Sequence, residues 1–101
     1  MTLASGVVLP TAVITEICRR YQVKELSVFG SAARGDLRPE SDIGLLVEFE
    51  PGARLGLLKY SALMRELSTV LGRKVDLVGK AGLKPLVRPE VLAEARVVYA
   101  A

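Results

Sequence analysis

Apolar residues follow a helical period in two stretches of this chain. The first stretch runs from Thr11 to Tyr21, and polar residues take its other side. Its apolar stripe consists of Val13, Ile14, Ile17, Cys18 and Tyr21. The second stretch, Leu55 to Leu71, keeps the same period for longer, and Gly72 follows where a left-handed helix cap is expected. These patterns predict two amphipathic helices that share one core.

Three shorter segments have the composition of strands. Leu26 to Phe29 is rich in apolar residues and ends at Gly30, and Lys74 to Val78 is similar. The third, Asp42 to Phe49, has apolar residues at alternate positions, which places Ile43, Leu45, Val47 and Phe49 on one face. Since Leu46 adds apolar character to its other face, this strand is expected to be covered on both sides.

The remaining segments complete one small α/β (α+β) unit. Residues Met1 to Leu9 show no clear period and predict a loose arm or a short strand. A short helix over Ser31–Arg34, a connector over Gly35–Ser41 and a loop over Gly79–Pro85 are expected, then a helix over Pro89–Arg96 and a strand over Val97–Tyr99. A mixed sheet flanked by helices, in a single domain over residues 1–101, is the simplest architecture.

Composition narrows the chemistry. The 101 residues include no histidine, which excludes Ser-His and Cys-His catalysis and histidine-ligated metals. The single cysteine, Cys18, lies on the predicted core face and suits a reducing compartment. A net charge of +3 permits an anionic partner without requiring nucleic acid. No apolar stretch approaches the ~20 residues of a membrane span, so a cytoplasmic protein is expected.

Two features of the segment from Phe29 to Val47 suggest chemistry. A strand ends at Gly30-Ser31, where the free N–H groups of a following helix and the Ser31 hydroxyl could hold a phosphate. Gly-Ser by itself is a weak signal, for which a plain helix-capping turn is the favoured explanation. Asp42 opens an apolar strand, and Asp76 lies inside another, where an unpaired charge is costly. Two acids on neighbouring strands predict a shared cation such as Mg²⁺.

Together these residues resemble the minimal nucleotidyltransferases of the polymerase-beta-like superfamily. The signature of that family is Gly-Ser, ten residues, and Asp-x-Asp. Here Gly30-Ser31 is followed by ten residues and then by Asp42-Ile43-Gly44. The later run Gly72 to Val78, which contains Asp76, also resembles the family. The resemblance spans roughly Thr11 to Tyr99 and implies the nucleotidyltransferase fold.

The resemblance also implies roles for individual residues. Gly30 and Ser31 would hold the triphosphate of ATP. Arg34 and Arg38 would be phosphate or partner contacts, and surface arginines that tie down the loop are an equal alternative for both. Asp42 and Asp76 would bind Mg²⁺, and Asp76 could help to activate an acceptor hydroxyl. The implied activity is transfer of AMP from ATP to a hydroxyl of a partner protein. The implied partner is a HEPN-type toxin, for which the chain would be the antitoxin.

Gly44 departs from this family pattern because it replaces the second Asp of the metal motif. Loss of one carboxylate should impair catalysis more than binding, since Mg²⁺ readily keeps water in a vacant position. Glu48, ~20 Å along the strand, is too far away to substitute. A natural pseudoenzyme, an engineered inactive variant and an enzyme with reduced metal dependence all fit.

Three functions therefore remain open from the sequence. The first is the AMP transferase. The second is an inactive binding module that neutralises its partner by contact, and the third is a nucleotide-binding structural subunit or homo-oligomer. The homo-oligomer would use the N-terminal arm or the last strand for pairing.

Overall fold

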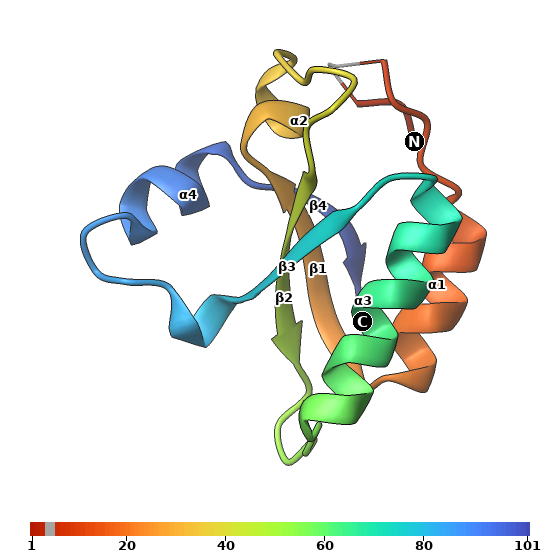
Figure 1. Cartoon of the computed structure of the whole chain (residues 1–101). Helices are drawn as coiled ribbons and strands as arrows, with labels where there is room; N and C mark the ends of the chain where they lie inside the picture. Colours follow the sequence, from red (N-terminus) through yellow and green to blue (C-terminus); the bar gives the residue numbers. More distant parts are fainter. Residues whose placement is uncertain (4–5) are drawn as a thin grey trace.

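One mixed sheet forms the centre of the molecule (Figure 1). The computed structural model describes residues 1–3 and 6–101. Its strands are β1 (Val23–Phe29), β2 (Ile43–Phe49), β3 (Val75–Gly79) and β4 (Arg96–Ala100), in the order β3-β2-β1-β4. β1 runs antiparallel to β2 and β4, whereas β2 and β3 are parallel. The expected small mixed sheet is confirmed.

Helices cover both faces of this sheet. The helices α1 (Thr11–Arg20) and α3 (Leu57–Leu71) pack on one face, and α4 (Arg88–Glu94) lies on the other (Figure 1). The short α2 (Ser31–Arg34) follows β1 at one end of the sheet, and a 3₁₀ helix, η1 (Lys80–Gly82), occupies part of the loop expected after β3. We call the side of the sheet opposite α1 and α3 the α4 face.

The core lies between the sheet and the pair α1 and α3. Ile43, Leu45 and Val47 of β2 are buried there, as the alternating pattern predicts. Cys18 is also fully buried, which confirms its expected place on the core face. The expectation for Val13 is wrong, because its side chain is 44% exposed. At 100° per residue, Val13 lies about 90° from the centre of the stripe that Ile14, Ile17, Cys18 and Tyr21 form.

The boundaries of several elements differ from those expected. β1 begins at Val23 rather than at Leu26, the expected start. A bulge between Val23 and Glu25 interrupts the alternation of apolar positions, so the sequence pattern does not reveal the first residues of the strand. The last helix ends at Glu94, so that Arg96 belongs to β4 instead. In the N-terminal arm, Thr2 and Val8 form an isolated antiparallel bridge, and residues 4–5 lie outside the described chain. Gly72 caps α3 with φ +65°, as its position predicts.

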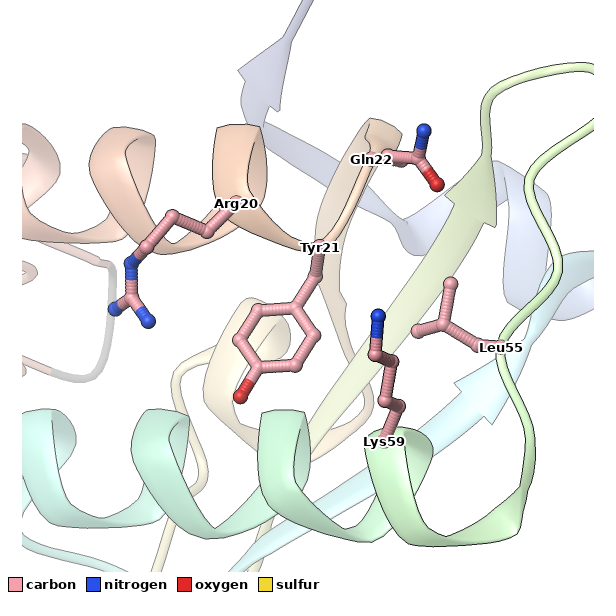
Figure 2. A pocket seen from close by; sticks show the side chains of 5 residues that line it. All are labelled: Arg20, Tyr21, Gln22, Leu55 and Lys59. Carbon is pink, nitrogen blue, oxygen red and sulfur yellow. The ribbon is translucent and has the colours of Figure 1, made fainter.

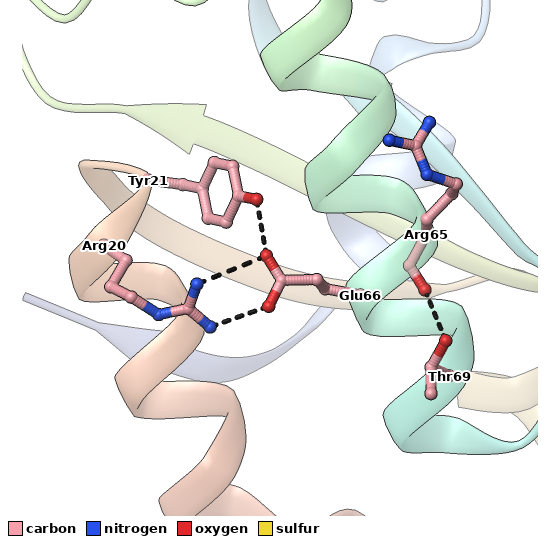
Figure 3. A network of polar contacts seen from close by, with 5 residues as sticks. All are labelled: Arg20, Tyr21, Arg65, Glu66 and Thr69. Carbon is pink, nitrogen blue, oxygen red and sulfur yellow. Dashed lines mark hydrogen bonds and ion pairs between the residues drawn. The ribbon is translucent and has the colours of Figure 1, made fainter.

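A polar network joins the end of α1 to α3 (Figure 3). The guanidinium of Arg20 donates two hydrogen bonds to the carboxylate of Glu66, the shorter of them 2.7 Å. The Tyr21 hydroxyl donates to the same carboxylate. These polar contacts therefore join α1 to α3 at the surface, in addition to the buried apolar side chains that the two helices share.

The backbone register arranges the α4 face in rows across three strands. The first row is Phe29, Gly44 and Asp76, and the second is Ser27, Leu46 and Val78. Leu46 is only 3% exposed, so β2 is covered on both sides, as expected. In the next row Glu25 pairs with Glu48, and the ammonium of Lys80 lies 3.7 Å from a carboxylate oxygen of each. Lys80 thus offsets the repulsion between two facing carboxylates.

None of the helices in the described residues is both long and apolar enough to cross a membrane.

Candidate functional site

Asp76 and Gly44 lie side by side on neighbouring parallel strands. Gly44 is the register partner of Asp76 on one side and of Phe29 on the other. Register partners point to the same face of a sheet, so the Asp76 side chain lies on the α4 face. Gly30 directly follows Phe29, and two strand spacings are about 10 Å. The backbone therefore brings Asp76 and the Gly-Ser turn to one end of one face.

Asp42 reaches the same end through the connector that precedes β2. Ile43 is fully buried on the core side, so the alternation of an extended chain directs Asp42 to the side of Gly44 and Asp76. The N–H of Ile43 donates to the carbonyl of Lys74 at 3.0 Å, so pairing with the β3 segment extends to this point. The two acids predicted from the sequence thus share a face of adjacent chain segments.

Arg73 holds the connector that delivers Asp42. Its guanidinium donates to the carbonyl oxygens of Arg38, Pro39 and Ser41, at 2.9, 3.3 and 3.1 Å. All three contacts come from one terminal nitrogen, Nη1, so a single group of Arg73 gathers the three carbonyls of the connector. Arg38 thus contributes a carbonyl to this contact while its side chain is exposed. Sequence reasoning missed Arg73 as a site residue, although it stands three residues before Asp76 in the run that resembled the family.

The carboxylates of Asp42 and Asp76 are exposed and have no partner among the described residues. No group of three acidic or cysteine side chains that could hold a metal occurs in residues 1–3 and 6–101. Magnesium in phosphate-transferring proteins is commonly held by one or two carboxylates together with substrate phosphates and water. Two unpaired carboxylates on one face fit that requirement, and a closed site made by protein ligands alone is absent from this part of the chain.

Phe29 occupies the space next to Gly44. A Cβ built on Gly44 would lie 3.0 to 3.2 Å from three atoms of the Phe29 ring, the nearest being Cζ. Those contacts are tighter than normal packing, although the ring can shift by a few tenths of an ångström. An aromatic ring over a strand glycine compensates for the missing side chain. Gly44 therefore removes a carboxylate and also leaves space that the apolar ring of Phe29 occupies.

The Gly-Ser turn has a backbone shape that favours glycine. Gly30 has φ +75° and ψ −149°, in a region that residues with a side chain rarely adopt. A Cβ there would meet nothing within 4 Å, so the constraint comes from the backbone and not from crowding. Ser31 begins α2 and is partly exposed. The turn is thus open to a ligand from the side of Ser31.

Arg34 and Gly30 share one acidic partner, Glu94 of α4. The backbone N–H of Gly30 donates to Oε1 of Glu94 at 3.0 Å, and Arg34 donates to both oxygens, at 3.4 and 3.2 Å. Asp36 lies 3.5 Å from Nε of Arg34. These partners raise the pKa of Arg34, and the hydrogen bond that Arg34 donates to Glu94 contributes most. A nucleotide contact by Arg34 remains a prediction, and no pattern in the sequence points to Glu94.

A hollow of about 360 Å³ lies at the opposite end of the molecule (Figure 2). Arg20, Tyr21, Gln22, Leu55 and Lys59 line it, where α1 ends and the chain approaches α3. Gln22 precedes β1 and Ser31 follows it, so a seven-residue strand, roughly 23 Å, separates the hollow from the Gly-Ser turn. The hollow is therefore separate from the acidic site.

Comparison with known families decides the assignment. A family model described as a nucleotidyltransferase domain matches residues 11–98 of the chain. The chain belongs to this family. The matched region of this nucleotidyltransferase domain contains the Gly-Ser turn, Asp42, Gly44 and Asp76, so the site lies inside the part that defines the family.

Individual proteins with similar sequences or structures support the same family assignment. Protein adenylyltransferase MntA of Thermococcus cleftensis is 43% identical over 89 residues, which cover 88% of this nucleotidyltransferase domain and 86% of the relative. The structure of a candidate minimal nucleotidyltransferase is 41% identical, with a TM-score of 0.72, covering 85% of this chain and 86% of that one. The fold also matches a complex of a tri-AMPylated Shewanella oneidensis HEPN toxin with an MNT antitoxin. That match has a TM-score of 0.64 at 18% identity and covers 90% of this chain and 70% of the other.

Proposed function

We propose that this nucleotidyltransferase domain binds ATP and transfers AMP to a hydroxyl of a HEPN-type partner protein, as the antitoxin of a toxin–antitoxin pair. The relatives' names support this proposal, since one is a protein adenylyltransferase and another is an MNT antitoxin beside an AMPylated toxin. The observation that carries it is the register of Asp76 with Gly44 and Phe29. In that register Asp76 shares a face of the sheet with Phe29, which directly precedes the Gly-Ser turn.

The chain's own residues would divide the work as follows. The Ser31 hydroxyl and the turn at Gly30 would bind the phosphates, with Arg34 as a further contact. The acceptor oxygen bonds to the α-phosphorus, the bond from that phosphorus to pyrophosphate breaks, and pyrophosphate leaves. Asp76 would orient the acceptor hydroxyl and accept its proton on a carboxylate oxygen.

Asp42 and Asp76 would also hold Mg²⁺ when it is bound. In such sites the ion neutralises phosphate charge and aligns the attacking and leaving oxygens. Because Gly44 offers no oxygen, this chain should bind the ion more weakly than a three-carboxylate site would. We infer a low rate of AMP transfer for the chain as it stands.

A second function rests on the same departure. With Gly44 in the motif, the domain can act as a module that neutralises its partner by contact, without chemistry. That function predicts a complex with the HEPN partner that is stable in EDTA and without nucleotide. Dissociation of the complex under those conditions excludes the contact function.

The deciding experiment measures transfer of labelled AMP. The domain is incubated with its co-purified HEPN partner, Mg²⁺ and ATP labelled in the α-phosphate. Incorporation that is lost in Asp76→Asn, but kept in the connector variant Glu40→Gln, supports the transferase. If no label enters the partner, even with Gly44→Asp, the transferase function is wrong.

A further inference from the structure

One carboxylate of α4 joins the two ends of α2. Gly30 precedes α2 and Arg34 is its last residue. Oε1 of Glu94 accepts from the Gly30 N–H at 3.0 Å, and both its oxygens accept from the Arg34 guanidinium. The same side chain therefore spans the complete Gly-Ser turn, although it lies 64 residues from Gly30 along the chain.

The turn needs support from outside itself. Gly30 has φ +75° and ψ −149°, and such conformations persist only where the surrounding structure holds them. A helix of four residues is too short to be stable by itself. Gly30, the N-cap residue, has no side chain that could cap the helix by a hydrogen bond. Glu94 is thus the principal polar contact that fixes the turn from another element.

Burial and charge agree with a permanent role for Glu94. Its side chain is only 21% exposed, whereas that of Arg34 is 50% exposed. A shielded carboxylate with three hydrogen bonds is held firmly, because hydrogen bonds to charged groups are stronger than neutral ones. Arg34 also neutralises the charge of Glu94. The carboxylate therefore adds little net repulsion toward a phosphate near Ser31.

We propose that Glu94 is a positioning residue, which fixes the Gly30–Arg34 turn in the shape that presents Ser31 to a nucleotide phosphate. This inference rests on the proposed function, since it names the residue that prepares the same site. The Gly30 peptide leads directly into Ser31, so a rotation at Gly30 turns the Ser31 hydroxyl away. The opposite role, in which Glu94 competes with the phosphate for the Gly30 N–H, predicts the opposite effect on affinity.

Calorimetry with ATP and Mg²⁺ separates these two roles. Glu94→Ala removes every contact, and Glu94→Gln keeps an acceptor for the Gly30 N–H but loses the charge. We expect affinity to fall roughly tenfold in Glu94→Ala and less in Glu94→Gln. Glu90→Ala, on the same helix and exposed, is the matched control and should bind like the parent chain. Unchanged or tighter binding in both Glu94 variants overturns the proposal.

A double-mutant cycle with Ser31→Ala shows whether Glu94 acts through Ser31. If it does, Glu94→Ala costs much less affinity when Ser31 is already absent, whereas equal losses in both backgrounds contradict the proposal. Melting temperatures verify that each variant is folded. If Glu94→Ala unfolds, Glu94→Gln replaces it in the double-mutant cycle.

Hydrogen exchange of the Gly30 amide, measured without nucleotide, tests the contact itself. Exchange should be faster in Glu94→Ala than in Glu90→Ala, and equal rates overturn the proposal. If the parent chain and Gly44→Asp both fail to bind ATP, the proposed function fails, and this exchange comparison still decides whether Glu94 fixes the turn.

Discussion

The Phe29 ring lies directly over Gly44, on the strand next to it. A Cβ on Gly44 would be 3.0 Å from Cζ of that ring. The ring thus occupies part of the space that an aspartate at this position would need. The missing carboxylate and the position of the ring are two aspects of one local arrangement.

Gly44→Asp should increase Mg²⁺-dependent AMP transfer, by roughly 10-fold or more if the third carboxylate completes the metal site. The ring must shift slightly to admit the new side chain, so a small loss of stability is expected at the same time. Labelled AMP incorporation and the melting temperature measure the two effects.

Gly44→Asn is the matched control, because it adds the same bulk without the charge. If the Asp and Asn variants were equally active, the missing carboxylate would not be the cause of the low activity. Phe29→Leu combined with Gly44→Asp should recover the lost stability, because the smaller side chain leaves room for the new one.

Gly30→Ala should destabilise the protein by about 1–3 kcal/mol, because a Cβ disfavours φ +75° even where no atom crowds it. Urea denaturation measures the loss. Gly82→Ala is the control, since a Cβ there also meets nothing within 4 Å and its φ is not positive. Similar losses in the two variants would refute the role of the backbone conformation.

Sequence reasoning located the acids and the Gly-Ser turn because each lies within a local pattern. The spacing from Gly30-Ser31 to Asp42 and the strand around Asp76 can be read without knowing the fold. Glu94 and Arg73 could not be found in this way, because their contacts cross 64 and up to 35 residues of chain. The space next to Gly44 also depends on strand pairing, which sequence alternation does not determine.

The helices show the same division between local and long-range information. Gly72 was predicted as a cap because left-handed glycine caps depend only on the preceding turn. Val13 was included in the apolar stripe although it lies at its edge. Burial at an edge position depends on how far the neighbouring elements extend around the helix, which the sequence period does not reveal. The start of β1 was placed late, since the bulge beside Val23 is imposed by pairing with β2.

Glu66→Gln should lower the melting temperature near neutral pH by roughly 2–5 °C, since it weakens the network with Arg20 and Tyr21. Its hydrogen bond from Arg20, and then that from Tyr21, lower the pKa of Glu66 below 4.5. A carboxyl with a lowered pKa in the folded state stabilises above its unfolded pKa. This contribution disappears as the pH falls from about 4.5 through the folded value.

The difference between Glu66→Gln and the parent chain should therefore vanish in acid. Thermal melts from pH 7 to pH 3 measure it, and Glu90→Gln, which changes an exposed carboxylate of α4 outside this network, is the control. A difference that persists undiminished at pH 3 would mean that charge does not drive the network.

Cys18 should be unreactive in the folded protein. Its side chain is fully buried, and burial raises the pKa of the thiol to about 11. Because the thiolate is the reactive form, a thiol reagent at pH 8 should label the chain only after unfolding in guanidinium. Rapid stoichiometric labelling of the native protein, followed by mass spectrometry, would contradict this burial.

The contacts of α4 have a consequence for control of the site. Asp76 lies within the backbone ladder of the sheet, whereas none of the seven described residues of α4 is buried. Strand pairing therefore holds Asp76, whereas the Gly-Ser turn depends on where α4, a helix without a buried residue, packs. A protein that binds α4 would therefore change the conformation of the phosphate-binding turn through Glu94, without contact to either aspartate.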